Sequence, residues 1–236
     1  MRLQSVNTVF KRELKAFLVS PSAYIVITIY LALTGWFFFS TFFLAGRADM
    51  RSFFNLMPLL FSFTIPAVTM RLFSEEYSTG SFEMLKTQPL TSADIVGGKF
   101  LSALAFIALM LVPTLAYALS ISFIGELDWG PVIGGYIGAL LMAGAYCAIG
   151  ILASSATRNQ IVAFILSAAV CVVLSLIDQL IWVLPSGLAG VLSRIGTAYH
   201  FTNVSKGIID SRDLVYFVSV IFMALYGSWL LNQEKE

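Results

Sequence analysis

The residues of this sequence that are typical of catalytic or binding sites are few, and most lie between its apolar segments. The segment Gly97-Gly98-Lys99-Phe100 has the Gly-Lys pair of a phosphate-binding loop, but it lacks the correctly spaced upstream glycine and the Ser or Thr that would bind magnesium. There is no HExxH pattern, His200 is the only histidine, and the apolar segments hold no carboxylate pair. We therefore predict that the chain is not an enzyme and binds no metal or cofactor itself.

The composition indicates a membrane protein. Of the 236 residues, 58% are hydrophobic and 11% are charged, and the mean hydropathy is +0.88. A soluble globular chain has about 25% charged residues, so this chain lacks the polar surface it would need in water. Its net charge of +1 gives no concentrated basic face for nucleic acid.

Six apolar segments predict an all-α membrane protein with six transmembrane helices between residues 22 and 231. Each segment approaches or exceeds the roughly 20 apolar residues that a spanning helix needs. Asp178 is the one candidate for a charge inside a span, whereas ion-coupled transporters normally keep several. Secondary transport is therefore a weaker alternative. The predicted spans are 22–45, 53–72, 100–124, 132–153, 160–183 and 214–231.

The first 20 residues predict an amphipathic helix that lies in the membrane surface. Apolar residues recur at intervals of three and four, which places them on one helical face, with basic residues elsewhere. Such a helix suits the anionic inner leaflet, although a simple charge cluster before the first span is an alternative. The apolar face consists of Leu3, Val6, Phe10, Leu14 and Phe17.

The basic residues in the connections predict the orientation. With the N-terminus inside, nine Lys and Arg residues lie on the cytoplasmic side and five on the opposite side, which favours both termini inside. The inner set is Arg2, Lys11, Arg12, Lys15, Arg71, Lys86, Lys99, Arg158 and Lys235, and the outer set is Arg47, Arg51, Arg194, Lys206 and Arg212.

Two connections are unusually long, and these are where function is expected. In the inner connection, residues 73–99, Phe82 and Leu85 lie one turn apart on a short amphipathic helix that Pro89 ends. The outer connection, residues 184–213, begins with an apolar stretch that is too short to cross the membrane, which predicts a re-entrant or surface-lying helical segment. On spacing alone, the inner helix is equally well explained as a cover for the end of the bundle.

The inner connection resembles the signature of permease subunits of type 2 ABC transporters. In that signature, a glutamate after the second span is followed by glycine, Ser or Thr, glutamate, leucine and proline, and then by Gly-Lys at the third span. The matching residues are Glu76, Gly80, Ser81, Glu83, Leu85, Pro89, Gly98 and Lys99. The outer segment around Tyr199-His200-Phe201 and residues 206–213 resembles the gliding-motility branch of that family.

The resemblance implies that the inner helix is a coupling helix, which docks on a separate ATPase subunit that binds ATP and magnesium. It further implies a homodimeric pathway, export, and a bacterial inner-membrane location with both termini cytoplasmic. A lone histidine is more often structural than a pH sensor. The implied ATPase-coupling residues are Glu76, Gly80, Ser81, Phe82, Glu83, Leu85 and Pro89. Those implied for the outer gate or an extracytoplasmic partner are Tyr199, His200, Phe201, Gly207, Asp210 and Arg212.

Two alternatives to a transport permease follow from the same residues. A scaffold that uses ATPase-driven motion to act on an extracytoplasmic partner would have the same spans and the same inner helix. The third possibility, an intramembrane enzyme, has few residues that could catalyse a reaction, because the spans hold no carboxylate pair and His200 lies outside them. Apolar spans suit lipidic or amphipathic cargo, but lipid-facing surfaces have the same composition, so the substrate does not follow from the sequence.

Overall fold

The computed structural model describes residues 3–45, 49–86, 89–180, 195–208 and 210–233, and every regular element among them is helical. Within these residues, six helical segments are long and apolar enough to cross a membrane. This confirms the predicted all-α class and the number of candidate spans. The predicted re-entrant stretch 185–192 lies outside the described residues.

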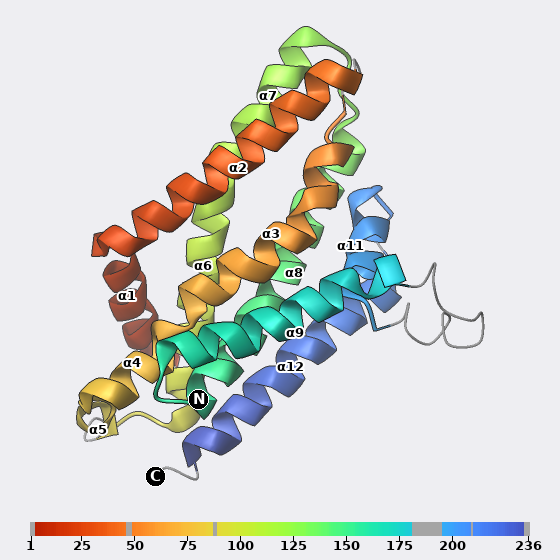
Figure 1. Ribbon diagram of the computed structural model, residues 1–236. Coiled ribbons are helices and arrows are strands. Elements are labelled where there is room, and N and C mark those ends of the chain that lie inside the picture. The colour runs from red at the N-terminus through yellow and green to blue at the C-terminus, as the bar shows by residue number, and fades with distance from the viewer. Residues whose placement is uncertain (1–2, 46–48, 87–88, 181–194, 209, 234–236) are drawn as a thin grey trace.

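Two of the six candidate spans are built from more than one element (Figure 1). α3 and α4 together form an apolar segment from Arg51 to Thr79, and α6, η1 and α7 form one from Ser92 to Ile124. The elements are α1 (Leu3–Val19), α2 (Pro21–Ala45), α3 (Arg51–Thr69), α4 (Arg71–Thr79), α5 (Ser81–Lys86), α6 (Ser92–Leu111), η1 (Val112–Thr114), α7 (Leu115–Ile124), α8 (Trp129–Ala156), α9 (Gln160–Leu180), α11 (Thr197–Ser205) and α12 (Ser211–Gln233).

α6 begins eight residues before the predicted third span because Thr91 and Asp94 form a capping box. The Asp94 N–H donates to Thr91 Oγ1 at 3.3 Å, and the Thr91 N–H donates to Asp94 Oδ2 at 3.2 Å. This reciprocal pair satisfies two N–H groups that have no partner within the helix. Lys99, assigned from the sequence to the inner connection, therefore lies on α6 itself.

α8 is the central helix of the bundle, and its small residues let neighbouring helices approach closely. A Cβ atom on Gly134 would lie 2.5 Å from the Val204 carbonyl oxygen of α11, and one on Gly135 would lie 2.3 Å from the Phe54 ring of α3. Small residues serve this purpose where helices pack in lipid. The small residues of α8 thus allow α3 and α11 to pack closely against it inside the subunit.

The two ends of the bundle carry the two connections that the sequence singled out (Figure 1). α4, α5 and the last turns of α12 lie together at one end, where the Tyr77 hydroxyl donates to Asn232 Oδ1 at 2.5 Å. α11 lies towards the opposite end and packs against α8 and α9. α5 and α11 are therefore separated by the length of the bundle.

α1 packs along α6 and buries part of its apolar face there. Val6, Val9 and Phe17 are buried, and the Phe17 ring stacks on Phe106 with centroids 5.0 Å apart. Lys11 on the other face is exposed. The amphipathic helix expected over residues 1–20 is thus attached to the bundle through one face.

Candidate functional site

The short helix expected between the second and third spans is present as α5, and a glycine turn separates it from α4. Gly80 has φ +72°, in the left-handed region that only glycine adopts without strain, and it ends α4. The Glu83 N–H donates to the Gly80 carbonyl at 3.2 Å, and the hydroxyls of Thr79 and Ser81 are 2.8 Å apart. These contacts hold α5 at a defined angle to α4.

The two apolar side chains of α5 whose positions are described face different ways. Phe82 is buried against the chain itself, with its ring centroid 4.8 Å from that of Tyr77 and 6.3 Å from that of Phe73. Met84, in contrast, exposes 75% of its surface. Phe82 therefore fixes α5 to the bundle, and Met84 presents an apolar surface outward. Glu83 and Pro89 are exposed, and the Leu85 side chain lies outside the described residues.

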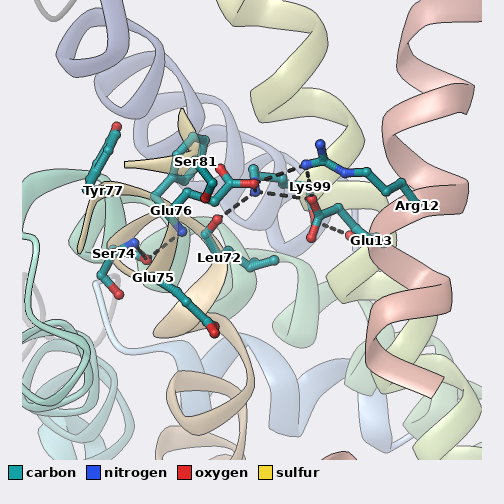
Figure 2. Close-up of polar contacts among 12 residues, drawn as sticks. Arg12, Glu13, Leu72, Ser74, Glu75, Glu76, Tyr77, Ser81 and Lys99 are labelled. Atoms are coloured by element: carbon teal, nitrogen blue, oxygen red, sulfur yellow. Dashed lines mark hydrogen bonds and ion pairs between the residues drawn. The ribbon is translucent and has the colours of Figure 1, made fainter. Parts of the chain in front are cut away.

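A cluster of four charged side chains lies between α4 and α1, with the buried Lys99 at its centre and Arg12 at its exposed edge (Figure 2). Lys99 Nζ donates to the Leu72 carbonyl oxygen at 2.6 Å and to Glu13 Oε1 at 3.2 Å, and it pairs with Glu76 Oε1 at 2.9 Å. Arg12 Nη2 bonds the same two carboxylate oxygens, at 2.5 Å for Glu13 and 3.0 Å for Glu76. The four side chains form a ring of alternating charge that joins α1, α4 and α6. We call it the Lys99 cluster.

The Lys99 cluster is electrically balanced, which explains how a fully buried ammonium is accommodated. Lys99 is 0% exposed, and its three N–H groups face three oxygen acceptors. Burial raises the pKa of Glu13, but the positive charges of Lys99 and Arg12 outweigh it, so the pKa lies below its ordinary value. The Glu13 carboxyl is therefore held ionised, as an ion pair in a low dielectric requires.

Gly98 explains how α1 comes close enough to supply Glu13. A Cβ atom on Gly98 would lie 2.6 Å from Val9 Cβ, so only glycine leaves room for α1 at this point. Glu13 follows Val9 by four residues, which places it one turn further along the same face of α1. The Gly-Lys pair of the signature thus acts in helix packing and ion pairing.

A groove of about 630 Å³ lies between α1 and the α4–α5 segment. Charged side chains of both signs line it, together with the aromatic ring of Phe17 and the exposed Met84. Its lining is Arg12, Glu13, Ala16, Phe17, Ser20, Arg71, Leu72, Glu75, Glu76, Thr79, Ser81 and Met84. Such a surface suits a protein partner with mixed charge better than a purely apolar ligand.

The residues expected at the outer gate all lie on or beside α11. His200 and Phe201 are buried in the bundle, and the others lie closer to the surface. Gly207 has φ +84° and packs against the backbone of Gly130, while Asp210 Oδ1 accepts from the Arg212 N–H at 3.0 Å in the first turn of α12. The exposed members of the set are Tyr199, Gly207, Asp210 and Arg212.

His200 has a buried carboxylate partner that the sequence did not single out. His200 Nδ1 lies 2.6 Å from Asp213 Oδ1, and the imidazole stacks on Tyr216 with centroids 4.1 Å apart. Both His200 and Asp213 are buried. This pair joins α11 to α12. In the part of the chain that the structure describes, no group of three or more His, Cys, Asp or Glu side chains is placed to hold a metal ion.

Sequence reasoning also missed Arg12, Glu13 and Asn232 at the inner end. Glu13 lies on the buried face of α1, between apolar residues, and its partner Lys99 is 86 residues away. A carboxylate between apolar residues on one face of α1 was a signal in the sequence that could have indicated a cation partner elsewhere in the chain, but that inference was not drawn. Nothing in the spacing identified which cation.

These features define an all-helical, multi-pass membrane subunit, with a short helix packed on one end of its bundle beside a charge cluster that joins α1, α4 and α6. Residues 37–193, about two thirds of the chain, match the family described as ABC-2 family transporter protein. The chain belongs to this family and is a permease subunit of an ABC transporter. No curated protein matches the chain significantly.

Proposed function

We propose that a separate ATPase subunit drives this permease by moving α5 and the end of α4 that carries it. ABC transporters are driven by ATPase subunits, and the sequence has no phosphate-binding loop of its own. Two copies of the chain form the pathway, and cargo is exported. The chain resides in the bacterial inner membrane with both termini cytoplasmic, so α4 and α5 face the ATPase.

The arrangement of α5 is the observation that carries this proposal. Its inner face is fixed by Phe82 against Tyr77 and Phe73, while Met84 extends outward beside a groove that α1 completes. A helix fixed on one face and exposed on the other can dock in a partner's groove. It can also pass a displacement to the helices that hold it.

Replacing Met84 with aspartate is expected to weaken association with the ATPase about tenfold, a loss of about 1.4 kcal/mol. Aspartate removes an apolar contact at the exposed surface of α5 and adds a charge that must be desolvated on docking. The measurement is the amount of ATPase that co-purifies with the tagged permease from its native membrane.

The Ser211→Asp variant is the matched control, because Ser211 is exposed in the first turn of α12, at the opposite end of the bundle from α5, and gains the same charge. It should retain the ATPase. Equal retention of ATPase by Met84→Asp and by the unmodified chain would contradict the assignment of α5 as the docking helix. The Phe82→Asp variant is a poorer test, since it removes a buried contact and displaces α5 as a whole.

Transport itself is tested with the purified complex in lipid vesicles. ATP-dependent movement of an amphipathic probe across the vesicle membrane is the result expected of an exporter. Robust ATP hydrolysis with no movement of any lipidic or amphipathic probe would favour the scaffold that transmits force to an extracytoplasmic partner.

The exposed faces of α2 and α12, whose spanning windows are each only 17% buried, are available to lipid or a second copy.

A further inference from the structure

The helix that leads from the second span to α5 is interrupted once, at Met70. α3 ends at Thr69 and α4 begins at Arg71, although Arg51–Thr79 forms one apolar segment. Met70 keeps right-handed helical dihedrals, with φ −53° and ψ −33°, and its N–H donates to the Pro66 carbonyl at 2.9 Å. The backbone of Met70 itself therefore stays helical, and the break lies in the ladder of hydrogen bonds between α3 and α4.

A serine from α8 fills this interruption. The Ser154 hydroxyl accepts from the Phe73 N–H at 3.0 Å and from the Ser74 N–H at 3.1 Å, and it donates to the Met70 carbonyl at 2.7 Å. In an uninterrupted α-helix, the Phe73 N–H would donate to the Thr69 carbonyl instead. A side chain inserted into the ladder is an established cause of a kink.

Gly150 holds Ser154 at this position. It lies one turn before Ser154 on α8, and a Cβ atom there would come within 2.0 Å of Thr69 Oγ1. The backbone of α8 therefore packs directly on the Thr69 side chain, at the last residue before the break. Ser154 is 0% exposed, so water does not compete for these bonds.

We propose that Met70 is a hinge and that Ser154 is the positioning residue that holds it in the kinked form. This rests on the proposed function, in which the ATPase moves α5. When α5 is displaced, the Phe73 N–H passes from Ser154 Oγ to the Thr69 carbonyl, and α3 and α4 become one straight helix.

The exchange gives each group that leaves Ser154 a new partner. In the straight form, the Phe73 N–H donates to the Thr69 carbonyl and the Ser74 N–H to the Met70 carbonyl, as in a regular α-helix. Ser74 Oγ already donates to the Met70 carbonyl, which therefore keeps a donor. The released Ser154 hydroxyl can donate to the carbonyl four residues earlier in its own helix, at Gly150. Two packed forms that differ by the exchange of a few hydrogen bonds are the kind of element that a modest external force can switch.

The test is a distance measured across the hinge by double electron–electron resonance, with spin labels on Phe63→Cys and Ser78→Cys. Both positions are exposed, and the native Cys147 and Cys171 are buried, so the labels attach where intended. Fifteen residues of straight helix span roughly 22 Å, and a kink shortens this distance. In lipid nanodiscs, the otherwise unmodified chain should give the shorter distance, and adding Ser154→Ala should lengthen it.

The Ser167→Ala variant is the matched control. Ser167 is equally buried, at 0% exposed, and its hydroxyl donates to the Ala163 carbonyl of its own helix. It should leave the distance unchanged. If Ser154→Ala also leaves the distance unchanged, Ser154 does not hold the kink. The Ser154→Thr variant keeps the hydroxyl, so its distance should be as short as that of the chain with Ser154.

The same labels in the complex with the co-purified ATPase test whether the hinge straightens when the ATPase binds nucleotide. Addition of a non-hydrolysable ATP analogue with magnesium should lengthen the distance, as Ser154→Ala does in the chain alone. An unchanged distance in an intact complex would overturn the hinge and leave the proposed function standing. Failure of any ATPase to co-purify would instead overturn the proposed function, while the measurement on the isolated chain would still decide the role of Ser154.

Discussion

Replacing Lys99 with methionine is expected to lower the free energy of unfolding by about 3 to 5 kcal/mol, the usual cost of removing one partner from a buried ion pair. Glu13 and Glu76 would remain in the cluster with only Arg12 to balance them. The Leu72 carbonyl would also lose its 2.6 Å donor. The measurement is reversible unfolding of the detergent-solubilised chain, followed by circular dichroism.

A compensated variant separates charge balance from packing. Combining Lys99→Met with Glu13→Gln and Glu76→Gln removes the buried excess charge, and it should recover much of the lost stability. Lys15→Met, which removes an exposed ammonium from α1, should have almost no effect. A single Lys99→Met variant as stable as the parent chain would show that the cluster contributes nothing.

Replacing Gly134 with alanine is expected to destabilise the chain by about 1 to 3 kcal/mol, although alanine is the better helix former. The new Cβ atom would lie 2.5 Å from the Val204 carbonyl oxygen and 3.0 Å from Gly207 Cα. Both are backbone atoms, so the turn after α11 must move as a unit. Faster hydrogen exchange of the Gly207 N–H, which donates to Val204 at 2.9 Å, would report that movement.

Gly144 provides the comparison within the same helix. A Cβ atom there would lie 3.0 Å from Cδ1 of Ile221, the flexible end of a side chain that can rotate away. Gly144→Ala should therefore be neutral, or should stabilise the chain by up to about 1 kcal/mol through helix propensity. Equal effects of the two substitutions would mean that the approach of α11 to α8 is not what restricts residue 134.

The apolar segments were sufficient to predict the class of fold, because a run of about 20 apolar residues has few alternatives to a membrane helix. The ends of the helices were less predictable. The Thr91–Asp94 capping box extends α6 far beyond its apolar part, and the break at Met70 depends on a serine more than 80 residues away. Hydropathy carries no information on either feature.

The residues predicted for the inner site come from one stretch of sequence, and the structure shows that Glu76 in this stretch also contacts α1 and α6. Amphipathic spacing correctly placed a short helix before Pro89, but it could not distinguish a side chain buried on its own chain from one presented to a partner. Phe82 is the first kind and Met84 the second. Glu76 and Lys99 were both singled out through the family signature, and in the structure they form a 2.9 Å ion pair within the chain.

The burial of Lys99 has a consequence for how the chain is made. Basic residues orient a membrane protein while it is being inserted, before its helices have packed together. At that stage Lys99 is an unpaired cation beside a nascent span, on the side that we propose to be cytoplasmic. Once α1 docks, the same ammonium is paired with Glu13 and Glu76 inside the bundle. Under the proposed orientation, the positive charge of Lys99 thus counts towards orientation before folding and towards ion pairing in the folded core.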